Sequence, residues 1–253
     1  MKTTFKAALI LTLIWNIILT VKVFFVKNAS FEIIDAERIN IVEKDGTKKL
    51  GIFSSGQYEY GISQRPGQGR LSGLLFFNED GYEAGGLVFR GKAFKGGGHD
   101  QGLGLTFDGY RQDQAISIQH SEYKTDSTSY YEDGIRIMSR PDFSDVKEEY
   151  GFYKLKYPDR FGDSTTPRLS KKEIDSLGFA LASKNKVSAS RIYIGSKRGL
   201  KNGEWFDESG LYVKNRYGKN VLKIYVDESN KPKIEVLDSL GKSVKYDLIK
   251  SIN

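Results

Sequence analysis

The stretch LLFFNEDGYEAGGLVF, residues 74–89, decides the fold. It holds an apolar run at 74–77, the turn Asn78-Glu79-Asp80-Gly81 and a second apolar run at 87–89. An Asn or Asp close to a Gly suits the positive-φ position of a tight turn, and Leu, Val and Phe suit the strands on either side. The stretch therefore predicts a β-hairpin.

Strand–turn–strand patterns of the same kind recur along the chain, at 38–53, 211–226 and 234–246. The turn glycines Gly46 and Gly81 are 35 residues apart, whereas Gly218 and Gly241 are 23 apart, so the pattern lacks the constant period of a regular solenoid or propeller. We therefore predict an all-β fold, a meander of β-hairpins that forms one large twisted sheet or a barrel-like body. A small β-propeller is the alternative.

The middle of the chain, at about 140–189, loses the strand alternation and predicts an irregular or helical insertion. The segment 170–173 reads S-x-x-E, which is a capping box at the start of a helix. Apolar residues then follow at i, i+3 and i+7 from Ile174, which gives one helical stripe. We expect a short helix at about 171–183 inside the insertion.

The first 27 residues predict a membrane segment. Residues 7–26 are nearly all apolar, and about 20 residues at roughly 1.5 Å each span one hydrocarbon core as a helix. The run is longer than the apolar region of a signal peptide and lacks small residues before a cut, which favours an uncleaved signal-anchor over export after signal cleavage. The short N-terminus with Lys2 and Lys6 favours an extracytoplasmic location for residues 28–253.

Composition excludes several classes of function. The chain has 39 Lys and Arg against 32 Asp and Glu, but four of the lysines lie in the first 27 residues, so the remainder is close to neutral and does not predict nucleic-acid binding. With no cysteine, there is neither a disulfide framework nor a thiolate metal site. Fifteen Tyr, fifteen Phe and 27 Gly are typical of a β-rich protein with many turns.

The segment 91–114, GKAFKGGGHDQGLGLTFDGYRQDQ, is the strongest candidate for a functional loop. One interpretation is a glycan-directed envelope hydrolase, in which a mobile Gly loop places His99 near Asp108 or Asp113 as a base–carboxylate pair or metal site. The alternative is a flexible hairpin loop whose Asp and Gln side chains satisfy turn backbone. The candidate residues are His99, Asp100, Asp108, Tyr110, Gln112, Asp113 and Gln114.

The chain lacks the usual catalytic motifs, since it holds neither G-x-S-x-G nor H-E-x-x-H. We therefore expect a non-catalytic binding or structural module of the cell envelope, with no catalytic residues, cofactor or metal. Its expected partners are the membrane, through residues 7–26, and a protein or glycan of the envelope. A patch of exposed aromatic side chains would suit such a partner.

Several segments resemble an uncharacterised family of bacterial membrane-anchored or exported β-rich proteins. They are ERINIVE with Asp45-Gly46, GGLVF at 85–89, FDGYRQDQ at 107–114, and RPDFS at 140–144. They fall in order, and the resemblance covers most of the chain. It implies a single-span or signal-bearing protein with a β-rich body, and it implies no activity and no catalytic residues.

Overall fold

A computed structural model describes residues 2–25, 31–56, 71–141, 146–161, 165–237 and 243–247. The chain divides into two compact units, Met1–Ala36 and Glu37–Asn253. Unit 1 contains helix α1 (Lys2–Phe25), whose span Thr4–Lys22 is long and apolar enough to cross a membrane. An N-terminal signal sequence meets the same criterion, so α1 is compatible with either an anchor or a signal.

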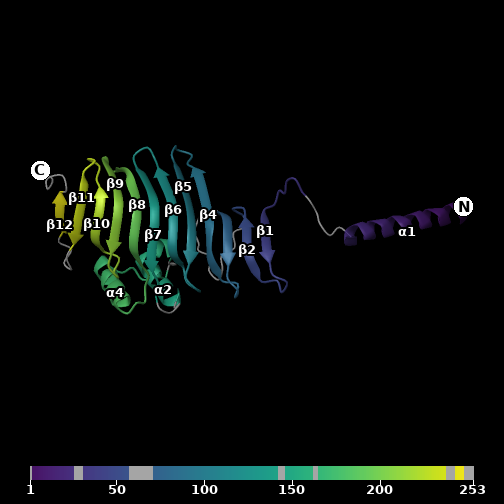
Figure 1. Ribbon diagram of the computed structural model, residues 1–253, viewed down its shortest axis with the longest axis horizontal. Coiled ribbons are helices and arrows are strands. Elements are labelled where there is room, and N and C mark those ends of the chain that lie inside the picture. The colour runs from purple at the N-terminus through teal and green to yellow at the C-terminus, as the bar shows by residue number, and fades with distance from the viewer. Residues whose placement is uncertain are drawn as a thin grey trace. The chain divides into compact units, whose positions relative to one another are not determined.

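The second unit is one antiparallel sheet in which each strand pairs with the next along the chain (Figure 1). Its twelve strands, counted over the described ranges, are β1 (Arg38–Val42), β2 (Lys48–Phe53), β3 (Ser72–Phe77), β4 (Glu83–Ala93), β5 (His99–Asp108), β6 (Gln114–Lys124), β7 (Ser129–Ser139), β8 (Ala189–Lys201), β9 (Glu204–Lys214), β10 (Asn220–Val226), β11 (Pro232–Leu237) and β12 (Ser243–Asp247). The predicted all-β meander is confirmed in its twisted-sheet form. The sheet is open, and it is not divided into the blades of a propeller.

The hairpin turns use the residues that the sequence supplies for them. Gly81 adopts φ 78°, and the side chain of Asn78 accepts hydrogen bonds from the backbone N–H groups of Asp80 and Tyr82, each at 3.0 Å. Gly46 and Gly218 likewise have positive φ. Glycine reaches this backbone conformation without a steric cost, which explains its place in each turn. The predicted turn at 238–241 lies outside the described residues.

Among the described residues between β7 and β8, where the insertion is predicted, the helices are α2 (Val146–Lys156), α3 (Pro158–Phe161) and α4 (Lys171–Ser183). The predicted capping box at the start of α4 is confirmed, with Ser170 and Glu173 bonding each other's backbone N–H. Phe152, Ala182 and Val187 form a small core within the insertion. Figure 1 shows the helices beside one end of the strands, which we call the helix end of the sheet.

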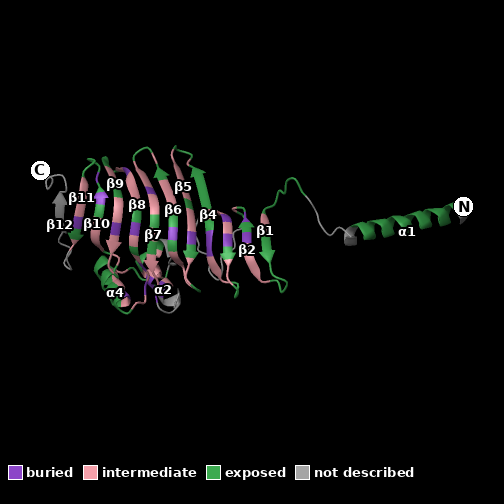
Figure 2. Ribbon diagram, viewed as in Figure 1, coloured by how far each residue is buried: buried purple, intermediate pink, exposed green. Residues whose placement is uncertain are grey.

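Alternation along the strands gives the sheet two faces of different chemistry. One carries Ile, Leu, Val and Phe from β1 to β11, and we call it the aliphatic face. The other carries small and polar residues together with Tyr193, Tyr212 and Tyr225, and we call it the tyrosine face. Buried residues form only short bands within the strands (Figure 2), because the sheet is a single layer.

Candidate functional site

The aliphatic face is built by strand register. Paired positions on successive strands place one apolar side chain of each strand in a continuous row that crosses the sheet. This central row consists of Ile39, Ile52, Leu74, Leu87, Leu105, Ile118, Ile135, Ile194, Leu211, Ile224 and Ile234. With strands about 4.8 Å apart, the row extends for about 50 Å.

A second row runs parallel to the first, two residues closer to the helix end of each strand. Gly85 is the single interruption of its apolar character, on β4. Its other members are Ile41, Leu50, Phe76, Phe107, Ile116, Ile137, Ile192, Val213, Leu222 and Val236. The two rows together make a continuous apolar strip across β1 to β11.

Much of this strip is open to solvent. Ile118 leaves 46% of its surface exposed, Phe107 48% and Ile194 50%. Further members with similar exposure are Ile41, Ile52, Phe76, Leu87, Ile116, Ile135, Ile137, Ile224 and Val236. An aromatic side chain offers about 150–250 Å² and an aliphatic one less, so the open apolar area of these twelve residues is on the order of 1,000 Å². A typical soluble monomer has a largest apolar patch of about 300–600 Å², so this face is exceptional.

On β6, β7 and β8, charged residues border the strip on the side away from the helix end. His120 of β6 lies opposite Asp133 of β7, with Nδ1 and Oδ1 2.5 Å apart. Glu122, two residues further along β6 on the same face, contacts His99 at 3.3 Å. Arg198 of β8 adds a positive charge 4.0 Å from Asp133. The border therefore carries both signs of charge.

The tyrosine face is closed by its own side chains. The ring of Tyr193 lies across Gly134, where an added Cβ would be 2.5 Å from Cε2. Its hydroxyl lies 3.0 Å from the carbonyl oxygens of both Asp133 and Ser196, and its single O–H can donate to either. Tyr193 also packs against Tyr212, with ring centroids 5.4 Å apart. Glycines thus allow the tyrosines to lie flat, and only 2% of Tyr193 is exposed.

A charged network on the tyrosine face centres on Glu132, whose side chain is 7% exposed. Tyr130 donates to its carboxylate at 2.7 Å, Arg136 also bonds it, and Lys197 lies 3.6 Å away. Burial acts to raise the pKa of Glu132, but the hydrogen bonds and the two cations outweigh it and hold the pKa below its ordinary value. The buried charge of Glu132 is therefore balanced by groups on the same face.

The predicted loop residues lie at opposite ends of one strand. His99 begins β5 and Asp108 ends it, nine positions away, which is about 30 Å at roughly 3.4 Å per residue. Asp113 lies in the turn beyond Asp108. His99 instead contacts Glu122, and Asp100 accepts from Arg90 at 3.2 Å. The arrangement postulated for a hydrolase, His99 with Asp108 or Asp113, is therefore not formed.

The other candidates form a structural corner at the helix end. The hydroxyl of Tyr110 donates to Asp80 of the β3–β4 turn, and this bond raises the pKa of the phenol. The guanidinium of Arg111 lies over the ring of Tyr82 at 4.4 Å. The side chain of Asp113 accepts from the backbone N–H of Gln114 at 2.9 Å. These contacts match the alternative interpretation, in which the polar side chains satisfy turns.

The same corner holds the helical insertion. The side-chain amide of Gln112 donates to the carbonyl oxygen of Pro141 at 2.6 Å, and Nε of Arg140 donates to the carbonyl oxygen of Gln114 at 2.5 Å. Two of the segments that carry the family resemblance, 107–114 and 140–144, thus contact each other through these residues. Residues 142–145 of the second segment lie outside the described residues.

Arg140 continues this network into the insertion. Its side chain is only 8% exposed, and Nη1 lies 2.6 Å from Oγ of Ser188 and 3.8 Å from Glu149. Glu149 also accepts from the backbone N–H of Ser188 at 3.0 Å and from the hydroxyl of Tyr153 at 2.8 Å. Burial and the neighbouring Glu149 raise the pKa of Tyr153. Buried polar groups thus join the first turn of α2 to β6, β7 and the start of β8.

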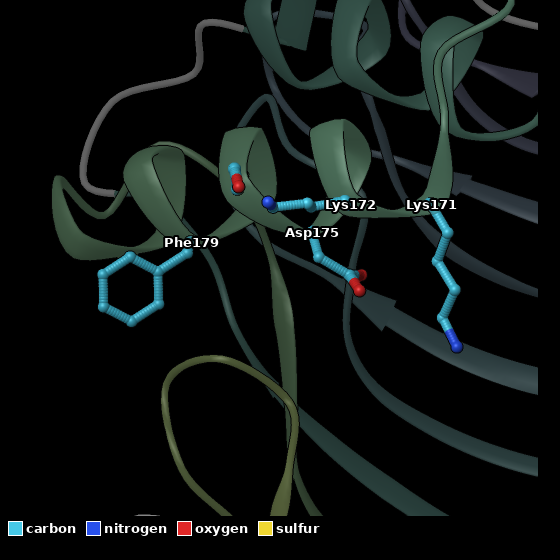
Figure 3. A pocket seen from close by; sticks show the side chains of 5 residues that line it. Lys171, Lys172, Asp175 and Phe179 are labelled. Carbon is cyan, nitrogen blue, oxygen red and sulfur yellow. The ribbon is translucent and has the colours of Figure 1, made fainter.

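The described part of the chain offers a depression on α4 as its pocket, apart from these residues. Within the described ranges, no group of three or more His, Cys, Asp and Glu could hold a metal ion. A shallow depression lies along α4, between Lys171, Lys172, Asp175, Ser176 and Phe179 (Figure 3). The ring of Phe179 stacks on Tyr217 of the β9–β10 turn, 4.4 Å between centroids. One helix supplies the whole lining, and none of the candidate loop residues belongs to it.

Sequence reasoning identified the hairpin strands at 38–53, 74–89, 211–226 and 234–246 but missed the aliphatic face as a site. The signal was present in the alternation of Ile116 and Ile118 with polar residues, which predicts one apolar side of the strand. Alternation within one strand does not show whether its apolar side is covered. The expected patch of exposed aromatics is instead a strip of mainly aliphatic side chains, with Phe76 and Phe107 among them.

Comparison with known proteins gives no relative. No protein-family model, no curated protein and no solved structure matches the chain.

Proposed function

We propose that this protein is a membrane-anchored, extracytoplasmic, non-catalytic module of the cell envelope that binds a partner through its aliphatic face. The observation that carries the proposal is the strip of about 1,000 Å² of open apolar surface on a single-layer sheet. Such a surface is unfavourable in water, and burial against a partner removes that cost.

The anchor and the topology support the same function. The apolar span Thr4–Lys22 lies near the N-terminus, and Lys2 and Lys6, which precede the apolar run 7–26, favour a cytoplasmic start. A cytoplasmic start would place residues 28–253 on the extracytoplasmic side of the membrane.

The polar residues of the described chain support a non-catalytic role. His99, Asp100 and Tyr110 each have a structural partner on a neighbouring strand or turn. The buried network of Arg140 and Glu149 is internally satisfied and holds the insertion in place. These contacts assign the conspicuous polar residues to the architecture of the sheet.

Single cysteines in this cysteine-free chain test the proposal in intact cells. Lys95→Cys lies in the exposed β4–β5 turn, and Ile194→Cys lies at the centre of the aliphatic face. A membrane-impermeant maleimide should label position 95 rapidly in intact cells, and position 194 rapidly only after the cells are dissolved in SDS. Protection of position 95 would contradict the extracytoplasmic location. Rapid labelling of position 194 in intact cells would contradict a covered face.

A further inference from the structure

We propose that the occupant of the aliphatic face is a second copy of this chain, packed face to face so that two single-layer sheets form one sandwich. The inference rests on the proposed function, because it names the partner that the binding face receives. Three properties of that face support a second copy as its occupant: the kind of side chain, the extent of the strip and the shape of the surface.

The side chains of the strip are those of a sheet core. Ile, Leu and Val dominate both rows, and Phe76 and Phe107 are the aromatic members. Sites for transient partners are enriched in Tyr, Trp and Arg, whereas permanent interfaces resemble a domain core that has been cut in half. The strip has the second composition, and it is continuous from β1 to β11.

The extent of the strip fits an identical partner. A stable interface of ordinary size buries about 800 Å² on each partner, and the open apolar area here is on the order of 1,000 Å². The strip is also about 50 Å long, so a partner must present an apolar surface of the same length. A second copy meets this requirement by construction, since a two-fold axis places the same patch on both sides of an isologous contact.

The shape of the face fits a sheet better than a small ligand. Small-molecule sites are concave and enclose most of their ligand, but the depression found in the described part of the chain lies on α4 and away from the strip. Open sheets pack against each other about 10 Å apart, with side chains from the two inner faces interdigitating. The aliphatic face offers such a layer across its full width.

The border and the anchor add to the case for self-association. The border carries His120 and Arg198 beside Asp133 and Glu122, so two copies can oppose unlike charges along it. Copies anchored in one membrane are also confined to a thin layer, which raises their effective concentration. Both effects favour a pair of identical chains over a free monomer.

The test uses the full-length chain with the single substitution Ile118→Cys, reconstituted in phosphatidylcholine vesicles over a hundredfold range of lipid-to-protein ratios. The control is Gln119→Cys, the next residue of β6, which lies on the tyrosine face. Two readouts are taken at each ratio: the rate of maleimide labelling and the fraction of chains joined by an amine cross-linker.

A second copy predicts slow labelling of position 118 and a cross-linked pair in concentrated vesicles. Dilution in lipid should raise the labelling rate at least tenfold and abolish the pair, while position 119 changes less than twofold. Slow labelling at every ratio without a cross-linked pair would overturn the proposal of a second copy. It would indicate that acyl chains or another part of the same chain cover the aliphatic face. The proposed function, which requires only that this face is covered, would then still stand. Fast labelling of position 118 at every ratio would likewise overturn the proposal of a second copy. If position 194 were also labelled fast in intact cells, the proposed function would be overturned as well.

Discussion

Ile118 of β6 stands directly opposite Ile135 of β7 on the aliphatic face, and the two side chains are 46% and 39% exposed. A pair of β-branched residues in the middle of a sheet is normally covered by a second layer. On the opposite face of the same strands, Ser117 is 3% exposed. The usual distribution is therefore inverted, with polar positions buried and aliphatic positions open. A partner on the aliphatic face would restore the usual distribution.

The tyrosine face depends on the absence of side chains beneath the rings. Gly134→Ala should destabilise the fold by about 1–3 kcal/mol, because the new Cβ would lie 2.5 Å from Tyr193 Cε2 and 2.6 Å from the carbonyl oxygen of Ile194. Gly104→Ala is the matched control two strands away, where the nearest atom would be 4.0 Å from the Cβ. Urea unfolding followed by circular dichroism measures both. Equal midpoints for the two variants would contradict the account of this face.

Replacing only one partner of the buried contact between Arg140 and Glu149 should lower the stability of the fold. Arg140→Met removes the guanidinium that bonds Gln114 and Ser188 and leaves the Glu149 carboxylate without its cation, so we expect a loss of about 3–5 kcal/mol. The double variant with Glu149→Gln should recover part of this loss. Additive effects in the double-mutant cycle, measured by urea unfolding, would show that the two residues do not interact.

Glu132 should make the fold sensitive to acid. Its pKa is below the ordinary value of 4.5 in the folded chain, so its charge stabilises the fold above that pH, and this contribution is lost as the pH falls through the folded-state pKa. Glu132→Gln should therefore lower the urea midpoint at pH 7 and have a smaller effect near pH 3. A difference from the native chain that is the same at both pH values would contradict this assignment.

The sequence predicted most of the fold because its signals are local. The Asn and Gly turns, the alternation of β6 and the S-x-x-E box at Ser170 each specify a structure within a few residues. Local signals do not report what covers a strand. The central row exists only because the register aligns Ile118, Ile135 and Ile194, and that alignment depends on pairing between strands.

The candidate loop residues show that local sequence signals also fail to predict which side chains meet in a site. The residues from His99 to Gln114 are close in sequence, but His99 and Asp108 lie at opposite ends of the strand β5. The partners of Gln112 and Gln114 are Pro141 and Arg140, which lie beyond the next two strands. Contacts at such sequence separation follow from topology, and composition and spacing do not reveal them.

The most direct test of the account is the mass of the assembled protein in the membrane after cross-linking in cells, for the native chain and two variants. Ile118→Glu places a carboxylate on the aliphatic face, and Gln119→Glu places the same group on the tyrosine face one residue away. The account predicts a two-chain species for the native chain and for Gln119→Glu, and a single chain for Ile118→Glu with unchanged circular dichroism. A two-chain species that survives Ile118→Glu, or a native chain that is never paired, would contradict it.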